Sequence, residues 1–257
     1  MALDLFAPGT TTALVLVACR VGGLLLVAPT LSAVVIPKQV RAGILVLLTI
    51  VLTPTALATY HGASLSIASF VSETFIGFAL GLGAAILVAA AEAAGDAMAV
   101  QIGLNGAAIL DPAGDQPAPI LGAFTRMFAV AVLLTFDLHG VMIRALAQSF
   151  TLIPAGTPGH LAEGAKAMVI SAGALFALGI RFAAPVIAAI LVVNVALATL
   201  GRAAPQLNVL SLSFPIQIAI GLAAFLTALP AIATFLSGWT SVYAGIVGGP
   251  LTTYARP

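Results

Sequence analysis

The amino-acid sequence predicts an all-α, polytopic integral membrane protein of about six long, partly kinked helices and helical hairpins. Hydrophobic residues make up 61% of the 257 residues, and the mean hydropathy is +1.20. Charged residues make up only 7%, whereas a soluble domain carries roughly 25%. The apolar residues fall into long runs, and a backbone that crosses lipid must satisfy its own hydrogen bonds, as a helix does.

Six segments are long enough to cross a bilayer, whose core of about 30 Å needs roughly 20 apolar residues in a helix. They span about 12–35, 42–60, 70–91, 121–150, 167–200 and 208–247. The chain begins without a basic stretch, so we interpret the first run as a span of the mature protein rather than a cleavable signal. In the last segment we predict bends at Pro215 and Pro230, because proline removes a backbone donor.

Turn-forming residues separate these segments. Ile36-Pro37-Lys38, with Arg41 just beyond, closes the first segment, and this short basic loop favours the cytoplasmic side. The longest irregular stretch is 103–122, where three prolines and four glycines exclude a straight helix. No linker divides the chain, so we predict a single membrane-embedded domain over residues 1–257.

Several function classes find no support in the composition. A net charge of +1 gives no basic surface for nucleic acid. Cys19 is the only cysteine, and we interpret it as a small buried hydrophobe. His61, His139 and His160 lie far apart without metal-ligand spacing. Because no catalytic motif is present either, we predict neither an enzyme nor a bound cofactor.

Five charged residues interrupt the apolar runs: Arg20, Glu73, Asp137, Arg144 and Arg181. A charge at a helix centre costs about 2.5–3.5 kcal/mol on insertion scales, so each needs a partner or water. Their mixed signs favour ion pairs across helices or positions near the membrane interface. The alternative is a self-contained secondary transporter that uses Arg20, Glu73 and Arg181 in a proton or solute path.

Two further patterns concern helix packing. Glu92 and Asp96 lie one helical turn apart and repel unless a cation is near, for which Arg126 or a partner protein is a candidate. Gly77, Gly81 and Ala85 recur at four-residue spacing, which lets helices approach closely. We interpret this stripe as packing within the chain rather than as a dedicated partner surface.

Many short motifs in this sequence occur together, in the same order, in one known family. They are Arg20, Ala28-Pro29, Ile36-Pro37-Lys38, Arg41-Ala42-Gly43, Gly95-Asp96, Gln101-x-Gly103, Asp111-Pro112, Leu121-Gly122, Phe136-Asp137-Leu138-His139-Gly140, Arg144-Ala145-Leu146, Ser149-Phe150, Pro154-x-Gly156, Val193-Asn194-x-Ala196-Leu197, Arg202-Ala-Ala-Pro205-Gln206-Leu-Asn208 and Phe214-Pro215. Over nearly its whole length the chain resembles the FliR family, which is called SctT in injectisomes. Leu138-His139-Gly140 and Ser213 depart from the usual family pattern.

The resemblance implies a non-enzymatic subunit of a flagellar or type III protein-export gate in the bacterial inner membrane, at the flagellar basal body. Its partners would be FliP-like, FliQ-like and FlhB-like subunits, with an FlhA-like subunit as a further candidate. Unfolded proteins would pass through the gate, and the lipid bilayer would surround it. The flagellar setting is the commoner one for this family, although the sequence alone does not separate it from an injectisome.

Two sets of candidate site residues follow from the resemblance. The irregular stretch 103–122 would supply a plug that closes the channel, and an ordinary exposed loop is the alternative. Its candidate residues are Gly106, Ala108, Leu110, Asp111, Pro112, Gly114, Asp115 and Pro117. Candidate contacts with neighbouring subunits at the gate are Lys38, Arg41, Arg202, Pro205, Gln206, Asn208 and Pro215.

Overall fold

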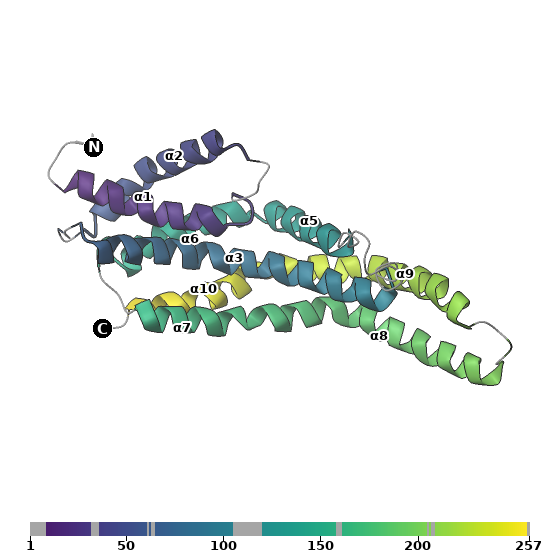
Figure 1. Ribbon diagram of the computed structural model, residues 1–257. Coiled ribbons are helices and arrows are strands. Elements are labelled where there is room, and N and C mark those ends of the chain that lie inside the picture. The colour runs from purple at the N-terminus through teal and green to yellow at the C-terminus, as the bar shows by residue number, and fades with distance from the viewer. Residues whose placement is uncertain are drawn as a thin grey trace. The chain divides into compact units, whose positions relative to one another are not determined.

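The computed structural model describes residues 9–31, 36–60, 62, 65–104, 120–157, 161–204, 206 and 209–255. In these ranges every regular element is a helix and no strand is present (Figure 1). The predicted all-α class is therefore confirmed. The helices are α1 (Thr10–Val27), α2 (Lys38–Leu57), α3 (Ile67–Ile102), α5 (Ile120–Thr135), α6 (Leu138–Leu152), α7 (Leu161–Ala172), α8 (Ala174–Ala203), α9 (Val209–Ser237) and α10 (Trp239–Ala255).

The prediction of about six membrane-spanning segments is also confirmed. Among the described residues, five helices are long and apolar enough to cross a membrane: α1, α2, α3, the α7–α8 run Ala162–Ala203, and α9 from Leu212 to Ser237. The pair of α5 and α6 passes the same test together, although the two helices are bent by 66°. With that pair counted as one broken span, up to six segments of the described chain could cross a membrane by length and composition.

Proline positions explain where the first helices begin and end. α1 ends at Val27, before the predicted end near residue 35, because Pro29 disfavours helical backbone at the residue before it. Ala28 accordingly has φ −55° and ψ 117°, although its amide still donates to the Leu24 carbonyl at 2.9 Å. α2 starts directly after Pro37.

The predicted segment 121–150 is two helices rather than one, which corrects the sequence-based boundary. Asp137 lies between α5 and α6 with φ 61° and ψ 38°. This left-handed conformation is uncommon outside glycine, and Asp is among the few residues that tolerate it. The break therefore falls at one of the charged residues that interrupt the apolar runs.

The predicted bend points in the last segment do not end a helix. α9 continues through both Pro215 and Pro230 and ends at Ser237, and Gly238 separates it from α10. Membrane helices tolerate proline because neighbouring groups satisfy the freed carbonyls. The interruption falls instead at a glycine, which costs more backbone entropy in a helix than other residues do.

The chain divides into two compact units, residues 1–87, 134–174 and 239–257 in the first, and residues 88–133 and 175–238 in the second. α3 contributes its first part to the first unit and its last part to the second. That the whole chain forms a single domain stays a prediction.

In the first unit α1 packs on α2, α2 on α6, and α10 on both α6 and α7. Its fully buried side chains include Leu16, Leu24, Ile76, Leu80, Phe150 and Trp239. The Tyr243 hydroxyl of α10 donates to the Leu80 carbonyl of α3 at 3.0 Å.

Glycines let α1 and α3 cross with their backbones in contact. A Cβ on Gly77 would collide with the Arg20 carbonyl oxygen, and one on Gly81 would lie 2.9 Å from the Leu24 carbonyl oxygen. From the other side, a Cβ on Gly23 would collide with the Thr74 carbonyl oxygen. The predicted stripe of small residues therefore serves packing within the chain at Gly77 and Gly81.

The second unit is built from the end of α3 together with α5, α8 and α9. α3 packs on α5 at Gly95, where an added Cβ would collide with the Thr125 hydroxyl. α3 also packs on α9 at Gly221, where an added Cβ would lie 2.5 Å from the Ile102 side chain. Phe124 and Phe225 join α5 to α9 edge to face at 5.8 Å between ring centroids.

We expect Gly77→Ala to destabilise the protein, because the new methyl group meets backbone atoms of α1 that cannot move aside. Overpacking of this kind costs typically about 1–3 kcal/mol. The apparent melting temperature in detergent should fall for Gly77→Ala and stay unchanged or rise for Gly43→Ala, since a Cβ on Gly43 has no neighbour within 4 Å. Equal melting temperatures for the two variants would contradict the close crossing of α1 and α3.

Candidate functional site

The plug candidates Gly106, Ala108, Leu110, Asp111, Pro112, Gly114, Asp115 and Pro117 all lie outside the described residues. The structure describes the chain on either side of them. α3 ends at Ile102, and Gly103 follows with φ 84°, a left-handed conformation that suits glycine. The chain is described again from Ile120, where α5 begins. α3 therefore ends where the predicted irregular stretch begins, whereas α5 already includes the last residues of that stretch, 120–122.

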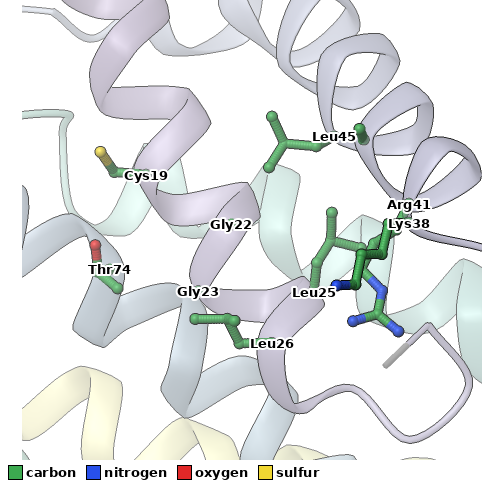
Figure 2. A pocket seen from close by; sticks show the side chains of 10 residues that line it. Cys19, Gly22, Gly23, Leu25, Leu26, Lys38, Arg41, Leu45 and Thr74 are labelled. Carbon is green, nitrogen blue, oxygen red and sulfur yellow. The ribbon is translucent and has the colours of Figure 1, made fainter. Parts of the chain in front are cut away.

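Lys38 and Arg41 lie in the first turn of α2, at the mouth of a groove between α1 and α2. We call it the α1–α2 groove; it has a volume of about 470 Å³ and is lined by Cys19, Gly22, Gly23, Leu25, Leu26, Lys38, Arg41, Ala42, Leu45 and Thr74. Figure 2 shows the side chains of Lys38 and Arg41 side by side, both directed from α2 toward Leu25 of α1.

The position of these two cations has a favourable electrostatic component. Leu25 belongs to the last turn of α1, where the carbonyl groups of a helix end carry partial negative charge. α1 has no basic residue in that turn, so Lys38 and Arg41 supply cations from the neighbouring helix. Lys38 is exposed and Arg41 is half-buried. The prediction that these residues contact other subunits is not tested by this geometry.

The other gate candidates are divided between described and undescribed residues. Arg202 lies exposed in the last turn of α8, and Gln206 is exposed in the turn that follows. Pro215 is exposed within α9. Pro205 and Asn208 lie outside the described residues. Arg202 and Gln206 therefore present a charged and a polar group at the surface of the second unit, which suits contacts with other molecules.

Sequence reasoning missed one polar contact in the second unit. The Gln217 side-chain amide of α9 donates to the Asn194 side-chain oxygen of α8 at 2.6 Å. A hydrogen bond between side-chain amides links helices well in apolar surroundings. In the sequence Asn194 belongs to a family motif, and the signal that could link it to Gln217 is that both residues are single amides within otherwise apolar runs.

The most completely bonded cluster of charges lies in the first unit, where Arg20 of α1 meets Glu73 of α3. The Arg20 Nε donates to Glu73 Oε2 at 2.6 Å, and its Nη2 donates to Oε1 at 3.1 Å. Both side chains are 0% exposed. A two-pronged arginine–carboxylate pair of this kind is among the strongest polar contacts in proteins.

Residues at the end of α6 complete this cluster. Arg20 Nη1 donates to the Ser149 hydroxyl and Nη2 to the Ile153 carbonyl, each at 3.0 Å. Glu73 Oε1 accepts from the Gly156 amide at 2.7 Å. The guanidinium carbon lies 4.2 Å from the centre of the Phe150 ring, within the range of a cation–π contact. A buried charge pair needs such additional bonds to offset the cost of removing it from water.

The predicted ion pairing across helices is confirmed for Arg20 and Glu73, whereas Asp137 and Arg144 pair locally at the start of α6. Arg144 donates to Asp137 at 2.9 Å, an exposed pair next to His139. Arg181 lies exposed on α8. The sequence suggests Arg126 as a cation near the acidic pair Glu92 and Asp96. The structure confirms this for Glu92, whose Oε1 lies 3.8 Å from Arg126 Nη1. Within the described ranges no group of three His, Cys, Asp or Glu residues could hold a metal ion.

Comparison with known proteins gives consistent matches along the chain. The sequence matches the family described as bacterial export proteins, family 1, over residues 11–241. It is 31% identical to the flagellar biosynthetic protein FliR of Escherichia coli (strain K12) over 222 residues, which are 84% of each chain. The FliR of Pectobacterium carotovorum subsp. carotovorum gives the same identity and coverage. The FliR of Caulobacter vibrioides is 25% identical over 232 residues, 89% of this chain and 91% of that protein.

We expect Arg20→Met or Glu73→Met alone to destabilise the protein strongly, because each leaves its partner as an unpaired buried charge. Such losses are about 3–5 kcal/mol, whereas replacing both partners by apolar residues is often close to neutral. The double variant Arg20→Met/Glu73→Met should therefore recover much of the melting temperature that either single variant loses.

Arg144→Met is the matched control, because it removes an arginine whose ion pair is exposed. A double variant that loses as much stability as the two single variants added together would refute a pairing role. Such additivity would mean that Arg20 and Glu73 stabilise the protein independently of each other.

Proposed function

This chain belongs to family 1 of the bacterial export proteins, and we propose that it is a structural subunit of the flagellar protein-export gate. In this role it helps to form and close the pore through which unfolded proteins cross the inner membrane. The match over nearly the whole chain is the observation that carries the proposal. Because the relatives named above are flagellar proteins, we favour the flagellum over an injectisome.

The distribution of buried residues supports a role within a larger assembly. In the most apolar 18-residue stretch of α3, 67% of the residues are buried, whereas the corresponding values are 22% for α2, 28% for the α7–α8 run and 22% for α9. Large apolar side chains such as Leu47, Val51, Ile180, Val192 and Leu226 are each at least half exposed. Lipid or other subunits must cover these faces.

We propose FliP-like, FliQ-like and FlhB-like subunits, together with an FlhA-like subunit, as the proteins that cover part of these faces. Lys38, Arg41, Arg202, Pro205, Gln206, Asn208 and Pro215 would contribute contacts at the gate. The role is non-enzymatic, and the multi-pass chain would reside in the bacterial inner membrane at the flagellar basal body. A polypeptide in transit would meet the chain only through the assembled pore.

We further propose that the segment with Gly106, Ala108, Leu110, Asp111, Pro112, Gly114, Asp115 and Pro117 plugs this pore at rest. A pore wide enough for an unfolded chain would also pass ions, so it needs a seal. Small side chains with glycine and proline bends make a compact segment that can move without unfolding a long helix. Irregular backbone at membrane depth is tolerated where it is buried in protein or lines a cavity.

The alternative of a self-contained secondary transporter receives no support. Arg20 and Glu73, which would form its proton path, bond each other and to groups of α6 and the turn that follows it. Arg181, the third proposed member, lies exposed on α8. No relative reported above is named as a transporter of small solutes.

We expect Arg202→Ala to weaken co-purification with the partner subunits and to reduce export. A hydrogen bond to a charged group contributes about 1.5–3 kcal/mol, so the expected loss of subunit affinity is on the order of tenfold or more. Pull-down of the tagged chain and secretion of flagellar proteins are the measurements. Lys166→Ala, which removes an exposed cation from α7, should leave both unchanged. If Arg202→Ala behaves like this control, the role of Arg202 at the gate is wrong.

Deletion of residues 106–119 should make the membrane leaky while the gate still assembles. The measurement is entry of a small dye into cells that carry the deletion, with pull-down of the partner subunits as the assembly control. A deletion that assembles normally and admits no dye would show that the seal lies elsewhere. If the deletion itself prevents assembly, a second variant separates the two effects. In this variant a Gly-Ser linker of equal length replaces the segment, and the gate should assemble and still leak.

A further inference from the structure

We propose that the α1–α2 groove binds one anionic phospholipid, with the phosphate at Lys38 and Arg41 and an acyl chain along the apolar walls. The groove lies entirely within the first unit. Its volume of about 470 Å³ lies within the range of small-molecule sites, about 300–1,000 Å³. The proposal does not depend on the export role, and such a lipid would take the place of the direct subunit contacts proposed above for Lys38 and Arg41.

The walls of the groove are suited to a hydrocarbon chain. Leu25, Leu26 and Leu45 line it together with two adjacent glycines of α1. Gly23 is needed for packing, since a Cβ there would collide with α3. Gly22 is different, because a Cβ there would meet only the Leu45 side chain, at an ordinary 3.7 Å. The absent side chain at Gly22 therefore leaves open space beside Leu45 that an acyl chain can fill.

The charge at the mouth of the groove selects an anion. Lys38 and Arg41 extend toward the same place beside Leu25 (Figure 2), while α1 and α2 contain no aspartate or glutamate. The carboxylate of Glu73, on α3, is bonded by Arg20 and the Gly156 amide. Basic pockets between membrane helices on the cytoplasmic side are typical sites for anionic lipid head groups.

The position of the groove favours a lipid over a soluble anion or a protein segment. Both α1 and α2 are long and apolar enough to span a membrane. The two cations belong to the first turn of α2 and point toward the last turn of α1, so they lie where the spans reach the head-group region. A soluble anion would use the cations but leave the apolar length empty, whereas a phospholipid matches both parts.

The test is native mass spectrometry of the full-length chain, in the complex with which it purifies, after delipidation. The probes are phosphatidylglycerol and phosphatidylcholine with identical acyl chains. We expect one tightly bound phosphatidylglycerol and at least tenfold weaker binding of phosphatidylcholine. Lys38→Gln/Arg41→Gln and, separately, Gly22→Leu should each weaken phosphatidylglycerol binding at least tenfold, whereas the exposed control Lys166→Gln should not.

Cys19 gives a second measurement, because it is the only cysteine and it lines the groove. Phosphatidylglycerol should slow its reaction with an uncharged maleimide in the parent protein but not in Lys38→Gln/Arg41→Gln. The proposal is overturned if Gly22→Leu binds the lipid normally, or if inorganic phosphate displaces it as well as free lipid does. Cross-linking of Cys19 to a partner subunit in native membranes would assign the groove to a protein instead.

Discussion

The first unit depends on one ion pair that is fully removed from solvent. Arg20 on α1 and Glu73 on α3 are joined by two hydrogen bonds, and both also bond to the end of α6 and the turn after it through Ser149, Ile153 and Gly156. Three parts of the chain, distant in sequence, are thereby fixed at one point. Since a lone charge in this place would be very costly, the pair makes other arrangements of these helices unfavourable.

The close crossing of α1 and α3 lies beside this pair. Gly77 lies one turn after Glu73 and packs on the carbonyl of Arg20 itself, so the same arginine contributes its side chain to the ion pair and its backbone to the crossing. In lipid, burying apolar side chains between helices gains no hydrophobic free energy, because the lipid tails are equally apolar. Dispersion contacts between closely packed helices therefore drive their association. The polar pair favours one register of the crossing, and the glycines allow the two backbones to approach closely beside it.

Much of the fold could be predicted from the sequence because lipid imposes a simple rule on composition. Long apolar runs gave the helices, and the glycine at residue 103 marked the end of α3. The break at Asp137 could not be predicted, because an aspartate in an apolar run does not by itself reveal that its backbone adopts a left-handed conformation. The partners of Arg20 were also out of reach, since its bonds to Ser149 and Ile153 span more than a hundred residues.

The candidate site was less accessible to sequence reasoning than the fold. The basic residues Lys38 and Arg41 were recognisable, but the groove that they close depends on how α1 lies against α2. The amide pair of Asn194 and Gln217 likewise depends on the pairing of α8 with α9. The apolar faces of the helices do not reveal which helix or subunit packs against them, because lipid and protein partners select the same residues.

Photocross-linking to a protein arrested during export tests the central claim most directly. A photoreactive residue in place of Ala108 should cross-link to a flagellar substrate whose folded carboxyl-terminal domain stalls it in the gate. The same residue should give no cross-link with a substrate that lacks its export signal. If export proceeds normally while neither position 108 nor position 110 ever cross-links to the arrested substrate, this chain does not line the path of the exported protein.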